Sequence, residues 1–184
     1  MMNAKRTLVL PGYANSGPGH WQTRWEALDP TFVRVAMPDW DHPVCDDWCD
    51  ALDRAVSAAG PQPVRIAAHS LGSLTTVVWA ARHHGGRAAS RIAGALLVAV
   101  PDPHGAEFPA DARGYEQVPK EPLPFPTIVV ASSDDPYGGV PFAERCAKAW
   151  GSRFIDLGPR GHINAESGLA DWPEGLAWLA SLES

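Results

Sequence analysis

The sequence predicts an α/β protein in which helices cover both faces of a parallel sheet, forming a three-layer α/β/α sandwich. Short runs rich in valine and isoleucine alternate along the chain with longer segments of helical pattern. The short runs are almost continuously apolar, which is typical of parallel strands that are buried on both faces. A length of 184 residues with 45% apolar residues fits a single domain, which we expect over residues 1–184.

The predicted strands follow these apolar runs in chain order. Each run has the length of a buried strand and is rich in small and branched residues. We predict six strands, over residues 7–11, 33–38, 64–69, 92–101, 127–132 and 153–157. In a sheet of this kind ligands bind at the carboxyl ends of the strands, so functional side chains are expected there.

The predicted helices lie between and after these strands. Their apolar spacing favours helices over residues 20–28, 44–59, 70–84, 140–150 and 172–182. Residues 101–126 are rich in proline and glycine and lack a convincing period. That segment is long for a plain connection, and we expect it to form a small flap over a site rather than a large lid.

Charge and cysteine content exclude several classes of protein. The chain has 15 basic and 21 acidic residues, a net charge of −6, and no cluster of lysine and arginine that could follow phosphates, so nucleic acid is not expected as a partner. The three cysteines include no Cys-x-x-Cys pair, which favours reduced thiols over a disulfide framework. No apolar run approaches membrane-spanning length, and the first is too short for a signal peptide. We expect a soluble, cytoplasmic protein without a membrane partner.

Ser70 lies where a predicted strand turns into a predicted helix. A small residue, Ala68, stands two positions before it and Gly72 two positions after it. Small neighbours let strand and helix pack closely enough to push a serine hydroxyl out above the sheet, which is the nucleophile elbow. The next backbone N–H, on Leu71, would lie at a helix N-terminus, where a developing oxyanion is stabilised. The alternative is that Ser70 only caps the helix.

An aspartate and a histidine follow in the order that a Ser-His-Asp triad on such a sheet requires. Asp134 and Asp135 come directly after the fifth predicted strand, and His162 follows the sixth in a glycine-flanked loop. We predict Asp135 as the acid, since it directly precedes Pro136, and we expect Asp134 to cap the turn or support the acid. The alternatives are ordinary turn formation for the aspartates and a surface position for His162.

A second oxyanion donor is expected in the loop after the first predicted strand. Gly12 permits a tight turn there, so we predict the N–H of Tyr13, with Ala14 as the less favoured donor. The alternative is a glycine-rich turn that binds no ligand. Nucleotide binding is disfavoured, because no Gly-Lys-Ser/Thr follows and the glycines lack dinucleotide spacing. No cofactor is therefore expected.

Several other residues are interpreted as structural. We expect His69 to be a packed, hydrogen-bonded core group that points away from the nucleophile. The tryptophans at 21, 25, 40 and 48 are candidates for a pocket lining, although helical spacing favours a core position for the first two. His42, Cys45 and Cys49 lack the second half of a zinc site, so no metal is expected.

The chain resembles small serine hydrolases of the α/β-hydrolase superfamily, in the group of retinoblastoma-binding protein 9 and the bacterial YdeN-like proteins. The resemblance spans nearly the whole chain, through "LPGY", "GHWQTRWE", "AHSLG", "PLPFP", "SDDPY", "GHINAESG" and "WPEGL". It implies a compact α/β-hydrolase fold with strand order 2-1-3-4-5-6, no large lid and no antiparallel opening hairpin. It also implies Ser70 as nucleophile, Asp135 as acid and His162 as base. Ala68 and Ser132 depart from the glycines that are usual in the wider superfamily.

The resemblance and the residues together predict hydrolysis of a small-molecule ester through an acyl-serine intermediate, as in a carboxylesterase. Thioester and peptide bonds stay open as substrates. A second class also stays open: a non-catalytic or very slow member of this fold that binds a protein through the proline-rich stretch. The sequence names no such partner.

Overall fold

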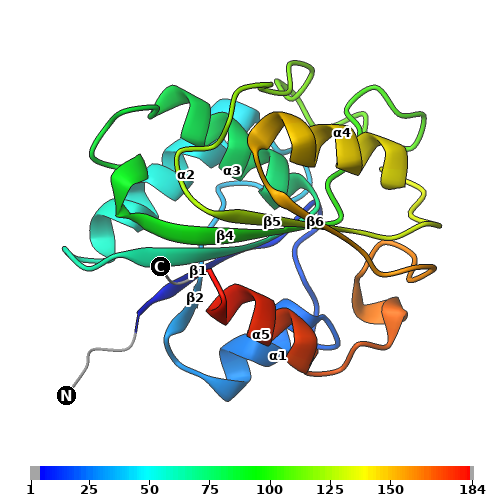
Figure 1. The fold of residues 1–184 in the computed structure, drawn as a ribbon, viewed down its shortest axis with the longest axis horizontal. Coiled ribbons are helices and arrows are strands. Elements are labelled where there is room, and N and C mark those ends of the chain that lie inside the picture. The colour runs from blue at the N-terminus through cyan, green and yellow to red at the C-terminus, as the bar shows by residue number, and fades with distance from the viewer. Residues whose placement is uncertain (1–4, 183–184) are drawn as a thin grey trace.

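The computed structural model describes residues 5–182. Its sheet has six parallel strands in the order β2-β1-β3-β4-β5-β6, as expected. Helices α2, α3 and α4 cover one face, and α1 and α5 cover the other (Figure 1). The ends of the expected domain, residues 1–4 and 183–184, lie outside the described residues.

Every predicted strand and helix is present. The strands are β1 (Thr7–Leu10), β2 (Phe32–Arg34), β3 (Val64–His69), β4 (Ile92–Val98), β5 (Thr127–Ala131) and β6 (Arg153–Asp156). The helices are α1 (Trp21–Leu28), α2 (Cys45–Ala58), α3 (Leu71–Arg82), α4 (Val140–Trp150) and α5 (Pro173–Ala180), with short 3₁₀ turns η1 (Ala89–Arg91) and η2 (Ala165–Ser167). Among the described residues, no helix is long and apolar enough to cross a membrane.

Two predicted strands are shorter than expected, because their partner strands end. β2 pairs only with β1, whose last residue is Leu10, so the chain beyond Arg34 soon has no strand to pair with. Val35 and Met37 are nevertheless buried, which explains why the apolar pattern continues. β4 ends at Val98, opposite the last residue of β3, and the next residue, Ala99, has a φ of 52° that breaks the strand.

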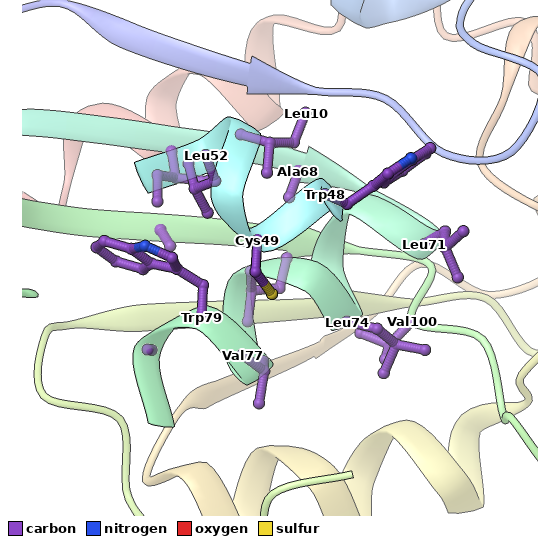
Figure 2. Packing of buried hydrophobic residues seen from close by; sticks show 14 of the residues in the cluster. Leu10, Trp48, Cys49, Leu52, Ala68, Leu71, Leu74, Val77, Trp79 and Val100 are labelled. Carbon is purple, nitrogen blue, oxygen red and sulfur yellow. The ribbon is translucent and has the colours of Figure 1, made fainter. Parts of the chain in front are cut away.

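Alternate residues of the central strands enter two separate apolar layers. Leu10 and Ala68 belong to the layer under α2, α3 and α4, whereas Val9 and Ala67 belong to the layer under α1 and α5. Figure 2 shows the first layer, in which side chains from α2 and α3 meet the sheet: Trp48, Cys49, Leu52, Leu74, Val77 and Trp79. Because both faces are covered, the strands are held in place and their carboxyl ends become a rigid platform.

The two tryptophans that helical spacing assigned to the core do lie there. Trp21 and Trp25 are buried, with ring centroids 4.5 Å apart, and both contact Trp172 before α5. Trp48 is also buried, and Trp40 packs partly buried against it. The rings of Trp21, Trp25 and Trp172 join α1 and the segment before α5 to the sheet.

Candidate active site

Ser70 occupies a strained turn between β3 and α3. Its φ of 52° and ψ of −122° lie outside the regions that side-chain-bearing residues usually adopt. Its N–H donates to the carbonyl of Val98 on the neighbouring strand at 2.8 Å, which anchors the turn. The Ser70 side chain makes no capping hydrogen bond to α3, so the capping alternative is wrong.

Two glycines provide the space that this turn needs. A Cβ atom at Gly72 would lie 2.4 Å from the carbonyl oxygen of Leu10, so α3 begins against the end of β1 only because glycine stands there. A Cβ atom at Gly12 would lie 2.8 Å from the Cβ of Ser70. The methyl group of Ala68 is buried in the core instead, which explains why alanine is accepted there.

The structure brings Ser70, His162 and Asp135 into one chain of hydrogen bonds. Ser70 Oγ lies 2.8 Å from His162 Nε2, and His162 Nδ1 lies 2.9 and 3.0 Å from the two oxygens of Asp135. The Asp135 side chain is fully buried. Its Oδ1 also accepts the N–H of Tyr137 at 3.0 Å, and the Tyr137 ring packs against that of His162, with centroids 4.4 Å apart. A carboxylate at Nδ1 keeps the proton on that nitrogen, which leaves Nε2 free to accept the serine proton.

Asp134 has a different set of contacts from Asp135. Asp134 Oδ1 accepts the hydroxyl of Ser132 at 2.8 Å and the N–H of Gly161 at 2.7 Å. These two hydrogen bonds hold the pKa of Asp134 below its usual range. The Ser132 hydroxyl also accepts the N–H of Arg160 at 2.8 Å. Ser132, at the position where many hydrolases have glycine, therefore helps to join the loop after β5 to the loop that carries His162.

A row of buried histidines beside the site was only partly anticipated. His69 is packed and hydrogen-bonded, as expected, and its partner is the main-chain carbonyl of His162 at 2.8 Å. The expectation that it points away from the nucleophile is wrong, since His69 lines the same cavity as Ser70. His20 caps α1 by accepting the N–H of Gln22, and its ring lies against that of His69, with centroids 4.6 Å apart. Nothing in the local sequence pattern places His20 here, since the contact joins residues far apart in the chain.

Burial keeps these two histidines uncharged. It lowers the pKa of His20 to about 3, with smaller contributions from Arg34 and His162. Burial likewise lowers the pKa of His69 well below its ordinary value. At neutral pH the two imidazole rings beside His162 are therefore neutral, and the charged group in contact with it is the carboxylate of Asp135.

A cavity of about 420 Å³ opens above Ser70. Its walls come from the loop after β1, the start of α3, the loops after β5 and β6, and the segment 101–126. From that last segment the lining residues are Pro101, Glu107, Pro109 and Ala110. The segment predicted as a flap thus forms one wall of the cavity.

Two residues predicted as oxyanion donors have backbone N–H groups without a hydrogen-bond partner in the described part of the chain. Leu71 and Tyr13 both line the cavity. Within residues 5–182, the N–H of neither residue makes a hydrogen bond, whereas the N–H of Ala14 donates to the carbonyl of Trp40 at 2.9 Å. The N–H of Ala14 is therefore occupied, whereas that of Tyr13 is not.

The described part of the chain holds no group of three or more histidine, cysteine, aspartate or glutamate side chains that could bind a metal. The His42 side chain is 70% exposed and contacts Asp39. Cys45 and Cys49 are buried in the core on α2.

Comparisons with known proteins concern the chain as a whole. A family model described as serine hydrolase matches residues 7–181. A structure described as a YdeN-like hydrolase from Pectobacterium atrosepticum is 34% identical, with a TM-score of 0.83 over 96% of this chain and 89% of its own. No curated protein matches the chain.

More distant solved structures share the fold. The ydeN gene product of B. subtilis is 20% identical, with a TM-score of 0.76 over 97% of this chain and 98% of its own. A thermophilic esterase from Thermogutta terrifontis is 16% identical, with a TM-score of 0.69 over 99% of this chain and 92% of its own.

The buried His20 is expected to make stability depend on pH. Between its folded pKa of about 3 and its ordinary value of 6.5, the unfolded chain binds a proton that the folded chain does not. The free energy of unfolding should therefore fall as the pH drops below 6.5, by about 1.4 kcal/mol per pH unit at most for this one group. His69 contributes in the same direction.

The variant His20→Asn isolates this effect, because asparagine can still cap α1. Urea unfolding at about pH 7 and about pH 5 should show that the wild type loses up to about 2 kcal/mol more than this variant does. His84→Asn, at an exposed position, is the control and should keep the wild-type pH dependence. Equal pH dependence in wild type and His20→Asn would contradict the prediction.

Proposed function

The chain belongs to this serine hydrolase family, and we propose that it hydrolyses small carboxylic esters through an acyl-serine intermediate. The observation that carries the proposal is the hydrogen-bonded series Ser70, His162, Asp135 at the base of a cavity. The three side chains have the mutual geometry of an activated nucleophile, a general base and an orienting acid.

In the first step Ser70 Oγ attacks the ester carbonyl carbon while His162 Nε2 takes the hydroxyl proton. Asp135 accepts the Nδ1–H of His162, so it fixes the tautomer and stabilises the imidazolium that forms. The carbonyl oxygen becomes an oxyanion, and the N–H groups of Leu71 and Tyr13 are the proposed donors to it. His162 then gives its proton to the leaving alcohol, and the acyl group stays on Ser70.

In the second step water replaces the alcohol. His162 takes a proton from a water molecule, which attacks the acyl carbon and forms a second oxyanion at the same N–H groups. The bond to Ser70 Oγ breaks, the proton returns to that oxygen, and the carboxylic acid leaves. Apart from the ester and the water molecule, the groups in this cycle are residues of the chain.

The cavity favours a small substrate that carries no negative charge. Its volume of about 420 Å³ lies in the range of small-molecule sites. Leu71, Pro101 and Pro109 give it apolar surface, and Asn15 and Asn164 give it neutral polar surface. Its lining, as the described residues form it, includes the carboxylate of Glu107 and no lysine or arginine, which favours a neutral ester over the thioester of an anionic carrier.

Hydrolysis of p-nitrophenyl acetate and butyrate, together with fluorophosphonate labelling read by intact mass, tests the proposal. We expect the wild type to turn over and to take one label per chain, whereas Ser70→Ala and His162→Ala lose at least about 10³-fold in kcat. Ser57→Ala, on an exposed position of α2, is the control and should behave as the wild type does. A wild type that neither turns over nor labels would favour the non-catalytic binding protein instead.

The two aspartates should differ sharply in the same assay. Asp135→Asn removes the carboxylate that orients His162, so kcat should fall about 10³- to 10⁴-fold. Asp134→Asn still offers an amide oxygen to Ser132 and Gly161, and its kcat should stay within about 10-fold of the wild type. Equal losses in the two variants, or the larger loss in Asp134→Asn, would contradict the assignment of Asp135 as the acid.

A further inference from the structure

We propose that His69 is a positioning residue for this reaction, because it holds the main-chain carbonyl of His162 and thereby keeps the imidazole between Ser70 and Asp135. The inference rests on the proposed function, since it concerns how the proposed base is held in place.

Two adjacent residues at the end of β3 bind opposite parts of His162. His69 Nε2–H donates to the His162 carbonyl oxygen at 2.8 Å, and Ser70 Oγ lies 2.8 Å from His162 Nε2. The rings of His69 and His162 are also in contact, with centroids 4.8 Å apart and an interplanar angle of 61°. The segment that carries the serine therefore fixes both the main chain and the side chain of His162.

The loop around His162 has backbone conformations that need such support. Gly161 has a φ of 57° and Ile163 a φ of 49°. A positive φ is unfavourable for a β-branched residue, so the surrounding contacts must hold it. The indole N–H of Trp21 donates to the carbonyl of Ile163 at 3.0 Å, and His69 supplies the contact at His162 itself.

His69 makes this contact without bringing a charge. It is 5% exposed and lies between the rings of His20, at the start of α1, and His162. Both buried histidines are neutral at neutral pH, because burial lowers the pKa of each. His162 becomes an imidazolium during the reaction, and a second cation in contact with it would oppose that step. A neutral N–H donor fixes the loop and avoids this repulsion.

Two substitutions of His69 by neutral amide side chains of different length test the inference. His69→Gln can place an N–H near the position of Nε2, whereas His69→Asn is one methylene group too short. With p-nitrophenyl butyrate we expect kcat of His69→Asn to fall about 10- to 100-fold with KM within about 3-fold, because misplacement of a reacting group affects the chemical step. His69→Gln should retain kcat within about 5-fold of the wild type.

A proton NMR signal reports the position of His162 independently of turnover. The Nδ1–H that is shared with Asp135 should appear far downfield in the wild type and in His69→Gln, and should weaken or shift in His69→Asn. If His69→Asn does not fold, His69→Phe, which keeps a ring without an N–H, replaces it with the same expectations.

The inference is overturned if His69→Gln and the folded variant without the N–H have equal kcat values and equal Nδ1–H signals. This holds whether both variants match the wild type or both are impaired. This failure is distinct from failure of the proposed function, which would appear as an inactive wild type or as an active Ser70→Ala.

Discussion

The backbone conformation of Ser70 is the constraint on which the rest of the site depends. A serine with φ of 52° between a buried strand and a buried helix is unfavourable by itself, so the surrounding packing must maintain it. The close approach of α3 to the end of β1 at Gly72 and the hydrogen bond from Ser70 to Val98 both hold this turn in place. The apolar layers on the two faces of the sheet fix the strand and the helix on either side of it.

The remaining groups reach this hydroxyl because parallel strands end at one edge. Asp135 follows β5 and His162 follows β6, and the loop after β1 brings Tyr13 into the lining of the same cavity as Ser70. Hydrogen bonds through Ser132 and Asp134 join the loops that follow β5 and β6. The relative position of Asp135 and His162 is therefore fixed by these hydrogen bonds between the two loops as well as by their own hydrogen bond.

Much of this arrangement could be predicted from local sequence pattern. The apolar runs identified all six strands, and the small residues around Ser70 together with the order of serine, aspartate and histidine identified the groups that the structure brings together. The length of β2 could not be predicted, because it depends on where its neighbour β1 ends.

The contact from His69 to the carbonyl of His162 spans 93 positions, and the ring of His20 joins it from a third part of the chain. Local periodicity carries no information on such long-range pairs. The preference for Tyr13 over Ala14 gained support only from the hydrogen bond that occupies Ala14.

A crystal structure of the protein after reaction with a phosphonate ester would test the central claim most directly, because the adduct resembles the tetrahedral intermediate. The account predicts a bond from Ser70 Oγ to phosphorus, with the phosphoryl oxygen within about 3 Å of the backbone nitrogens of both Leu71 and Tyr13. Phosphorus on another residue, or a phosphoryl oxygen directed away from both nitrogens, would contradict it.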